Sequence, residues 1–444
     1  AVGGVGDMLA GSTRIARVRP VRSVQSVRRF WSKDNPKPAE AAASPFETVT
    51  ISEANRLVVN SIKSFGYSDA EAHVMKECMM WAQLRDNNQG IIKITSGGVA
   101  PGANTKPPVV EFDSPTGARV NGNQTMSMVV LESAVDLAIE KALAVNVAVV
   151  GTSNTAQSCG ALGYYTEKIA KEGLIGIVMA SSPEFVAPFG AKQPIFGTNP
   201  IACGVPTSEG IMLMDQATAA FPWFGLLEAQ TAGRKIPKDV AFDANGVPTD
   251  DPSAALKGAL RTFDRGYKSS NLALMVELLA GPLVGAAHKN KLAAKNWGNL
   301  VLAIHPRMLG DADTFYAAAG EVLERVRTAE RLPGVSEMVL PGERERKMAM
   351  GRVQEGTVPL ERNMLGELRV LAAKYEASVG AQPSGGMGDR QTELLEQLLM
   401  RLDRLEGKVA ATAKHQEQLS KQQERLETVT VASLSSIRQE NNTK

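Results

Sequence analysis

The 444-residue sequence is poor in the side chains that most often build disulfides, metal sites and imidazole catalysis. Its three cysteines, Cys78, Cys159 and Cys203, are too few and too scattered for a disulfide framework or a CxxC metal site. Sparse cysteine is typical of a reducing compartment. Histidine is equally scarce, and the four that occur are His73, His288, His305 and His415. Any reaction that needs an imidazole therefore has only four candidates.

Two further absences narrow the class of protein. No uninterrupted apolar run reaches the roughly 18–20 residues that a membrane-spanning helix needs, so we expect none. The net charge is only +2, which gives no overall attraction to nucleic acid. Asp243, Asp250 and Asp251 could bind a cation, but turn and helix-cap positions explain them, and we predict no metal site.

Composition divides the chain into segments. Residues 1–33 hold six arginines and one acid, which is typical of a mitochondrial transit peptide; a basic arm that binds an acidic partner is the alternative. Residues 34–47 and 378–390 are predicted linkers because they are polar and rich in proline or glycine. Residues 48–377 between them are the predicted folded domain.

The C-terminal segment 391–440 has a different pattern. Apolar residues recur in steps of three and four from Leu395 onward, and mostly Glu, Gln, Lys and Arg stand between them. This heptad seam predicts a coiled-coil helix that pairs with itself or with a protein partner. A solvated single helix is the alternative.

The central segment predicts an α/β fold. Ser52 and Ser68 are expected N-caps of two amphipathic helices, and residues 91–95 are expected to form a short strand or a turn. Helices are also predicted at 126–144, 160–173, 272–279, 314–330 and 361–377. Apolar runs without polar alternation, at 145–151, 173–180 and 300–304, suit strands that are covered on both faces.

The stretch Ser181–Thr207 carries several prolines and the glycines Gly190, Gly197 and Gly204 between two strand-like runs. Proline fixes φ and glycine permits positive φ, so the segment can hold a bent, specified path. Such a path predicts a pocket wall or a tight crossover, and a long surface loop is the alternative.

Several segments taken together resemble the malate/L-lactate dehydrogenase type 2 family, which includes sulfolactate and ureidoglycolate dehydrogenases and diketogulonate reductases. The matching text runs from about Thr48 to Tyr375 and includes SSPEFVAPFGAKQPIFGTNPIACGVP, DQAT, KIPKDVAFDANGVPTDDP, YKSSNLALMVELLAG and LPGERE. The resemblance implies an NAD(P)-dependent oxidoreductase with a mixed-sheet, non-Rossmann α/β fold. It also implies a homodimeric core.

The sequence departs from this family where the reaction is expected. Gln89 occupies the position at which the resemblance implies the family's acid/base histidine. Lys93 occupies the position of a substrate-binding arginine, and Ser158 occupies the position of a second histidine beside the cofactor. Glutamine has no titratable proton near neutral pH, so it cannot act as a general acid or base.

The cofactor positions are partly retained. Thr198, Asn199, Thr218 and Lys268 match candidate cofactor-binding positions of the family. In the helix start DRGYKSSN, however, Ser269 and Asn271 stand where the family has glycines, and we expect their side chains to obstruct close approach of the cofactor phosphates.

From these departures we expect a catalytically degenerate protein without a required cofactor, serving as a structural subunit of a large mitochondrial assembly. A respiratory-chain complex, ATP synthase or ribosome would be a natural host. The alternative is an active NAD(P)-dependent dehydrogenase of a small 2-hydroxy acid such as malate or lactate, with Lys93 at a depressed pKa, or Tyr267, as the acid/base. A third hypothesis is a module that binds dinucleotide without turnover.

Overall fold

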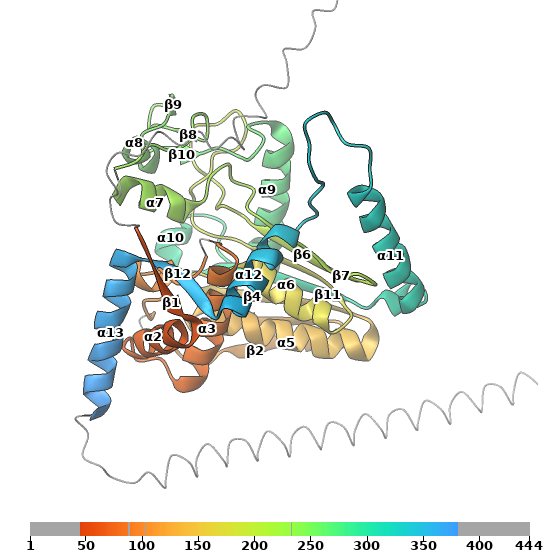
Figure 1. The fold of residues 1–444 in the computed structure, drawn as a ribbon, viewed down its shortest axis with the longest axis horizontal. Helices are drawn as coiled ribbons and strands as arrows, with labels where there is room; N and C mark the ends of the chain where they lie inside the picture. The colour runs from red at the N-terminus through yellow and green to blue at the C-terminus, as the bar shows by residue number, and fades with distance from the viewer. Residues whose placement is uncertain (1–44, 88, 103, 232, 381–444) are drawn as a thin grey trace, which may run out of the picture.

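The structure, a computed structural model, describes residues 45–380 except residues 88, 103 and 232 (Figure 1). The predicted transit-like segment 1–33 and the predicted coiled-coil helix 391–440 lie outside the described residues. No described helix combines the length and the apolar character that crossing a membrane requires.

A mixed sheet of seven strands forms the centre of the fold, in the order β2-β3-β4-β11-β5-β6-β7. Only the β3–β4 pair is parallel, and the other neighbours are antiparallel. The strands are β2 (Val109–Ser114), β3 (Gly117–Asn121), β4 (Val147–Thr155), β5 (Ile175–Ala180), β6 (Ile201–Thr207), β7 (Gly210–Gln216) and β11 (Trp297–Ile304). This arrangement confirms the predicted α/β class and mixed sheet.

Alternate residues of the central strands face two different layers of helices. Val178 and Val301 pack in the larger core with α5 (Ser127–Val145) and α6 (Leu162–Lys171). Met179 and Leu300, one residue away, pack instead with α9 (Tyr267–Ala280) and η1 (Pro282–Val284). The sheet is therefore covered on both faces, which explains the apolar runs in its strands.

The two ends of the described chain meet beside the sheet. β1 (Phe46–Thr50) pairs antiparallel with β12 (Thr357–Glu361), and α2 (Ile51–Lys63) packs on α13 (Arg362–Gly380). α3 (Asp69–Leu84) is capped by Ser68 in a capping box, as predicted. The predicted N-cap Ser52 of α2 is wrong: the Thr50 side chain accepts the hydrogen bond from the Glu53 N–H, at 3.0 Å.

A smaller unit covers one end of the sheet. It contains a three-stranded sheet in the order β10-β8-β9, with its own apolar core. Its elements are α7 (Trp223–Thr231), β8 (Ala241–Phe242), β9 (Pro248–Thr249), α8 (Pro252–Leu256) and β10 (Ala259–Leu260). The segment Ser181–Thr207 crosses into this unit, where Val186 pairs with Phe196 and Leu260, before it enters β6. It is therefore a crossover and not a surface loop.

The remaining elements are α4 (Ile92–Thr95), α10 (Lys291–Ala294), η2 (Pro306–Met308), α11 (Ala312–Arg327) and α12 (Glu343–Glu355). The expectation of a strand or turn at residues 91–95 is wrong in part, because 92–95 form the short helix α4. A strand there would have placed successive side chains on opposite faces, whereas the helical turn buries both Lys93 and Ile94.

Candidate active site

Lys93 is one of two lysines in the described part of the chain that have almost no exposed surface. Its side chain is carried by α4 and only 1% of the residue is exposed. The Nζ atom lies 3.4 Å from the centre of the Phe224 ring of α7. Burial lowers the pKa of the amine to about 7, against a smaller opposing effect of the Cys159 and Cys78 thiols. At neutral pH the amine is therefore divided between its charged and neutral forms.

Asp215 is a second titrating group in this region. It lies near the end of β7, and its Oδ2 atom accepts a hydrogen bond of 2.8 Å from the Gly163 N–H at the start of α6. Burial of the carboxyl group raises its pKa to about 6, although the hydrogen bond from Gly163 works in the opposite direction. Trp81 also lies against Gly163, so Asp215 is held between α3 and α6.

Cys159 connects these two groups. Lys93 lowers the pKa of the Cys159 thiol and Asp215 raises it, so the thiol lies within electrostatic range of both. Burial dominates, and the pKa of Cys159 is raised to about 11. The thiol is thus neutral near pH 7 and is a poor nucleophile. We group Lys93, Cys159 and Asp215 as the candidate catalytic cluster because Cys159 is coupled electrostatically to each of the other two; no contact between Lys93 and Asp215 is among those described.

Sequence reasoning missed two members of this cluster. Asp215 was noted only as part of the family-like text DQAT, and Cys159 only as one of the three scattered cysteines. Phe224 gave no signal, since an apolar residue in a loop-rich stretch is usually core. The position of Asp215 at the end of an apolar strand was the one clue that could have been used.

Gln89 and Ser158, at the positions of the family's two histidines, have local roles. The Gln89 N–H donates to Asn87 Oδ1 at 2.9 Å, and the residue is half-buried. Ser158 Oγ accepts from the Gly160 N–H at 3.2 Å and so fixes the turn in which Gly160 has φ of +76°. Both residues stabilise the chain path near the cluster, and neither side chain supplies a base.

Two of the candidate cofactor residues, Asn199 and Thr218, are fully buried, and Thr198 is half-buried. The N–H and Oγ1 of Thr218 both donate to the carbonyl of Thr198, at 3.0 Å. Asn199 is fully buried, and its Nδ2 donates to Ala273 O at 3.0 Å and to Glu277 Oε2 at 2.9 Å. Asn199 therefore holds the crossover segment against α9, and Thr218 holds it against the stretch that follows β7.

Lys268 differs from these three, since it is exposed in the first turn of α9. The N-cap of α9 is Gly266, whose N–H donates to Asp264 Oδ1 at 2.7 Å. Ser269 is fully buried and its hydroxyl bonds to Asp264, so the expected obstruction by this side chain is not found. Asn271 is exposed. The Asp264 carboxylate, whose pKa is lowered by these hydrogen bonds, therefore occupies the start of α9 beside the exposed cation of Lys268.

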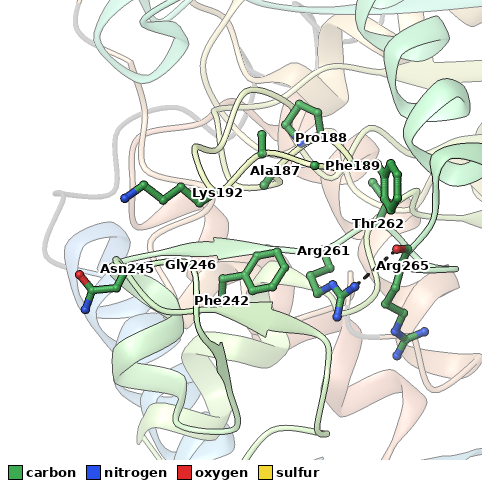
Figure 2. Close-up of a pocket in the computed structure, with 12 residues that line it drawn as sticks. Ala187, Pro188, Phe189, Lys192, Phe242, Asn245, Gly246, Arg261, Thr262 and Arg265 are labelled. Carbon is green, nitrogen blue, oxygen red and sulfur yellow. Dashed lines mark hydrogen bonds between the residues drawn. The ribbon is translucent and has the colours of Figure 1, made fainter.

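A cavity of about 450 Å³ lies beside this helix end (Figure 2). Its wall comes from the crossover segment, the β8–β9 hairpin and the stretch that follows β10. The lining residues are Ala187, Pro188, Phe189, Gly190, Ala191, Lys192, Phe242, Asn245, Gly246, Arg261, Thr262 and Arg265. The predicted pocket wall at Ser181–Thr207 is therefore present in its first half. Lys93, Cys159 and Asp215 do not line this cavity.

Comparison with known proteins agrees with this fold. The family described as malate/L-lactate dehydrogenase matches residues 49–369. The L-sulfolactate dehydrogenase of Methanothermobacter thermautotrophicus is 36% identical over 279 residues, which cover 61% of this chain and 79% of that protein. The malate/(S)-sulfolactate dehydrogenase of Methanothermus fervidus is 31% identical over 339 residues, covering 73% of this chain and 97% of that protein.

A solved structure is similar over the same region. The sulfolactate dehydrogenase of Methanocaldococcus jannaschii superposes with a TM-score of 0.64 at 28% identity, covering 74% of this chain and 98% of that chain. All three relatives are named as dehydrogenases. The expectation of a catalytically degenerate structural subunit of a mitochondrial assembly is therefore wrong, and the relatives favour the active alternative. The relatives' names also give no support to the expectation that no cofactor is needed.

Proposed function

We propose, from the premise that this chain belongs to the malate/L-lactate dehydrogenase family, that it is an NAD(P)-dependent dehydrogenase of a small 2-hydroxy acid such as malate or lactate. The observation that carries the proposal is the buried amine of Lys93, which lies with Cys159 and Asp215 in one cluster. The relatives' names support the reaction class, and the cluster supports the way in which this chain would carry it out.

Lys93 performs the proton transfer in this proposal. A 2-hydroxy acid must lose its hydroxyl proton as the hydride leaves carbon, so the reaction requires a base within hydrogen-bond reach. A base whose pKa lies near the working pH is the most effective, and a buried lysine reaches such a value by desolvation. Neutral Lys93 accepts the proton during oxidation, and the resulting ammonium group returns it during reduction.

Access to Lys93 requires a rearrangement of Phe224. The aromatic ring covers the amine, and the described structure leaves Lys93 almost no exposed surface. The neighbouring Trp223 is stacked on Phe185, with ring centres 3.7 Å apart, so α7 is anchored next to the ring that must move. Substrate binding therefore displaces the Phe224 side chain while α7 stays attached.

Lys268 and the adjoining cavity suit the cofactor, since they offer an exposed cation and space beside the start of α9. Lys268 would hold a cofactor phosphate, as at many helix N-termini. When bound, NAD(P) supplies the hydride acceptor, which no protein side chain can provide.

A turnover assay tests the proposal. Purified protein is supplied with malate, lactate or sulfolactate and with NAD⁺ or NADP⁺, and formation of the reduced nucleotide is followed by its absorbance. We expect turnover with at least one pair. Absence of turnover with every pair, together with no nucleotide binding at millimolar concentration in calorimetry of the folded protein, would exclude the proposed activity.

A further inference from the structure

The last described helix, α13, has apolar residues on two opposite sides. One side packs on α2 and in the larger core, and its residues are Met364, Leu365, Leu368 and Ala372, each at most 7% exposed. At about 3.6 residues per turn, the opposite side carries Gly366, Val370, Ala373 and Ala377. All four are exposed, and Val370 is 70% exposed. The described part of the chain therefore leaves this second side, the outer face of α13, uncovered.

The outer face differs from an ordinary solvent-facing helix surface, which carries charged and polar side chains. Charged residues stand at its two edges instead. Arg369 and Glu376 form the edge toward α2, where the Glu376 carboxylate accepts a hydrogen bond from Asn60 Nδ2 at 2.7 Å. Glu367 and Lys374 form the other edge. An apolar stripe between two charged edges is typical of a helix that packs against another helix.

Gly366 gives independent support to this interpretation. A Cβ atom built on it would meet no heavy atom within 4 Å, and its φ is not positive. Neither the described packing nor the backbone angle therefore requires glycine at this position. Glycine inside a helix is destabilising relative to alanine. A second helix packed on the outer face would account for it, because the distance between two helix axes depends on the size of the side chains at the contact.

The heptad segment 391–440 carries a matching surface on the same chain. Only residues 381–390 separate it from the end of α13. The first half of its seam is apolar and large, and consists of Leu395, Leu398, Leu402, Leu405 and Val409. As a helix this part would extend over about 21 Å, against about 17 Å for the outer face of α13 from Gly366 to Ala377. The two stripes are thus similar in length, and large residues on one would meet small residues on the other.

The outer face and the heptad segment also lie together relative to the family. The family match ends at residue 369, whereas α13 continues to Gly380. Val370, Ala373 and Ala377 therefore lie beyond the matched region, as does the whole of 391–440. A segment added to the family domain thus begins with an uncovered apolar face and continues with an apolar seam that needs a partner.

From this combination we propose that Leu395–Val409 folds back antiparallel on the outer face of α13 of the same chain. The ten residues 381–390 reach about 33 Å when extended, whereas packed helix axes lie about 8–10 Å apart, so the chain can reverse its direction. A linker this short also gives the segment an effective concentration in the millimolar range, which favours it over the same segment of a second copy. The docked segment covers Val370 and anchors the rest of the C-terminal segment to the domain.

Disulfide cross-linking of the full chain tests the contact directly. Val370→Cys combined with Leu402→Cys places one thiol in the middle of each stripe. Oxidised glutathione should link this pair within one chain at least about tenfold faster than the control pair Val322→Cys with Leu402→Cys, because docking raises the effective concentration. Val322 is also an exposed valine, but it lies on α11, on the opposite side of the molecule from α13 (Figure 1).

The outcome of cross-linking distinguishes the possible occupants of the outer face. A non-reducing gel and peptide mass spectrometry separate links within one chain from links between two chains. A link within the chain supports the proposal. A link between two chains would show that a second copy supplies the segment, and a rate equal to that of the control pair would show that the outer face stays bare; either result overturns the proposal.

Hydrogen exchange of the full chain gives a second test that needs no cysteine. The amides of 395–409 should exchange at least about tenfold more slowly in the wild type than in Val370→Glu, because a packed helix opens less often than an unpacked one. Gly366→Leu should expose the same amides although it favours the helix, so loss of α13 cannot explain the result. Val322→Glu is the control and should leave their exchange unchanged. Fast exchange in the wild type, or slow exchange that persists in both α13 variants, would refute docking on α13.

Discussion

The amino group of Lys93 lies 3.4 Å from the centre of the Phe224 ring, and this contact joins the main domain to the smaller unit. α4 belongs to the region packed on the large core, whereas α7 packs with α8 and the small sheet. The ring favours the charged amine through its π face, but the loss of water is the larger effect and lowers the pKa. The contact therefore sets the protonation state of the proposed acid/base.

Replacement of the proposed base is the first prediction. Lys93→Met should lower kcat/KM by about 10²–10⁴-fold, because general acid–base catalysis contributes that much. Methionine keeps the length and the apolar burial of the stem. Lys347→Met, an exposed lysine on α12, is the matched control and should retain activity. If Lys93→Met is fully active and Tyr267→Phe is not, exposed Tyr267 is the acid/base instead.

The pH dependence of the reaction follows from the same amine. Only neutral Lys93 accepts a proton, so kcat/KM for oxidation should rise as the pH passes through about 7 and level off above it. The rate of reduction should fall over the same interval, because it requires the ammonium form. Asp215→Asn should remove any additional change near pH 6, where this carboxyl group titrates. A profile that is unchanged in Lys93→Met would assign the titration to another residue.

The free energy of unfolding should also depend on the protonation of Lys93, and this can be measured without any assay of activity. The folded pKa of Lys93 is about 7 and its ordinary value is 10.5, so the unfolded chain binds more protons between these pH values. The free energy of unfolding should therefore rise as the pH increases across this window. Below about pH 7 the full cost of burying the Lys93 amine is present. Lys93→Met should remove the rise and should be more stable than the wild type at pH 6, by on the order of a few kcal/mol. Denaturant unfolding at pH 6 and pH 9 measures both effects, and equal pH dependence in the two proteins would contradict the burial of a neutral amine.

Two substitutions of Phe224 should move the titration in opposite directions. Phe224→Ala admits water to Lys93 and should raise the midpoint of the pH–rate profile toward the ordinary lysine value. Phe224→Leu keeps the apolar cover but removes the aromatic ring. The π face of the ring favours the charged amine by about 0.5–2 kcal/mol, so its loss should lower the midpoint. A midpoint that shifts the same way in both variants would show that the ring acts only through the position of α7.

The order of the elements could be predicted from the sequence more fully than their assembly. Apolar runs located β4, β5 and β11, and the capping residue Ser68 located α3. That β11 inserts between β4 and β5 could not be predicted, because this pairing joins residues far apart in the chain. The mitochondrial location, the homodimer and the helix at 391–440 stay predictions.

The candidate site was predicted only in part, for a related reason. Lys93 was identified as a possible base, but its burial depends on Phe224, which lies in a distant segment of the sequence. Asn199 matched a cofactor position of the family, yet it is used inside the protein to hold α9. Local pattern identifies the chemical type of a side chain, and the partners that decide its role are set by tertiary contacts.

The final prediction concerns the buried ion pair under α9. Lys291 Nζ lies 2.7 Å from Glu277 Oε1, and the two side chains are 0% and 9% exposed. Glu277 Oε2 also accepts the hydrogen bond from Asn199, so one carboxylate connects α9, α10 and the crossover segment. Lys291→Met leaves this carboxylate buried without its cation and should destabilise the protein by about 3–5 kcal/mol.

The double variant Glu277→Gln with Lys291→Met should recover much of this loss, because glutamine is neutral and can still accept the hydrogen bond from Asn199. A double-mutant cycle in denaturant unfolding gives the coupling energy between the two residues. Because the same α9 carries Lys268 in its first turn, Lys291→Met should also weaken nucleotide binding, and the double variant should restore it. If the two substitutions change the free energy of unfolding additively, Lys291 does not stabilise the buried Glu277 carboxylate. Lys291→Met should then leave the nucleotide affinity unchanged.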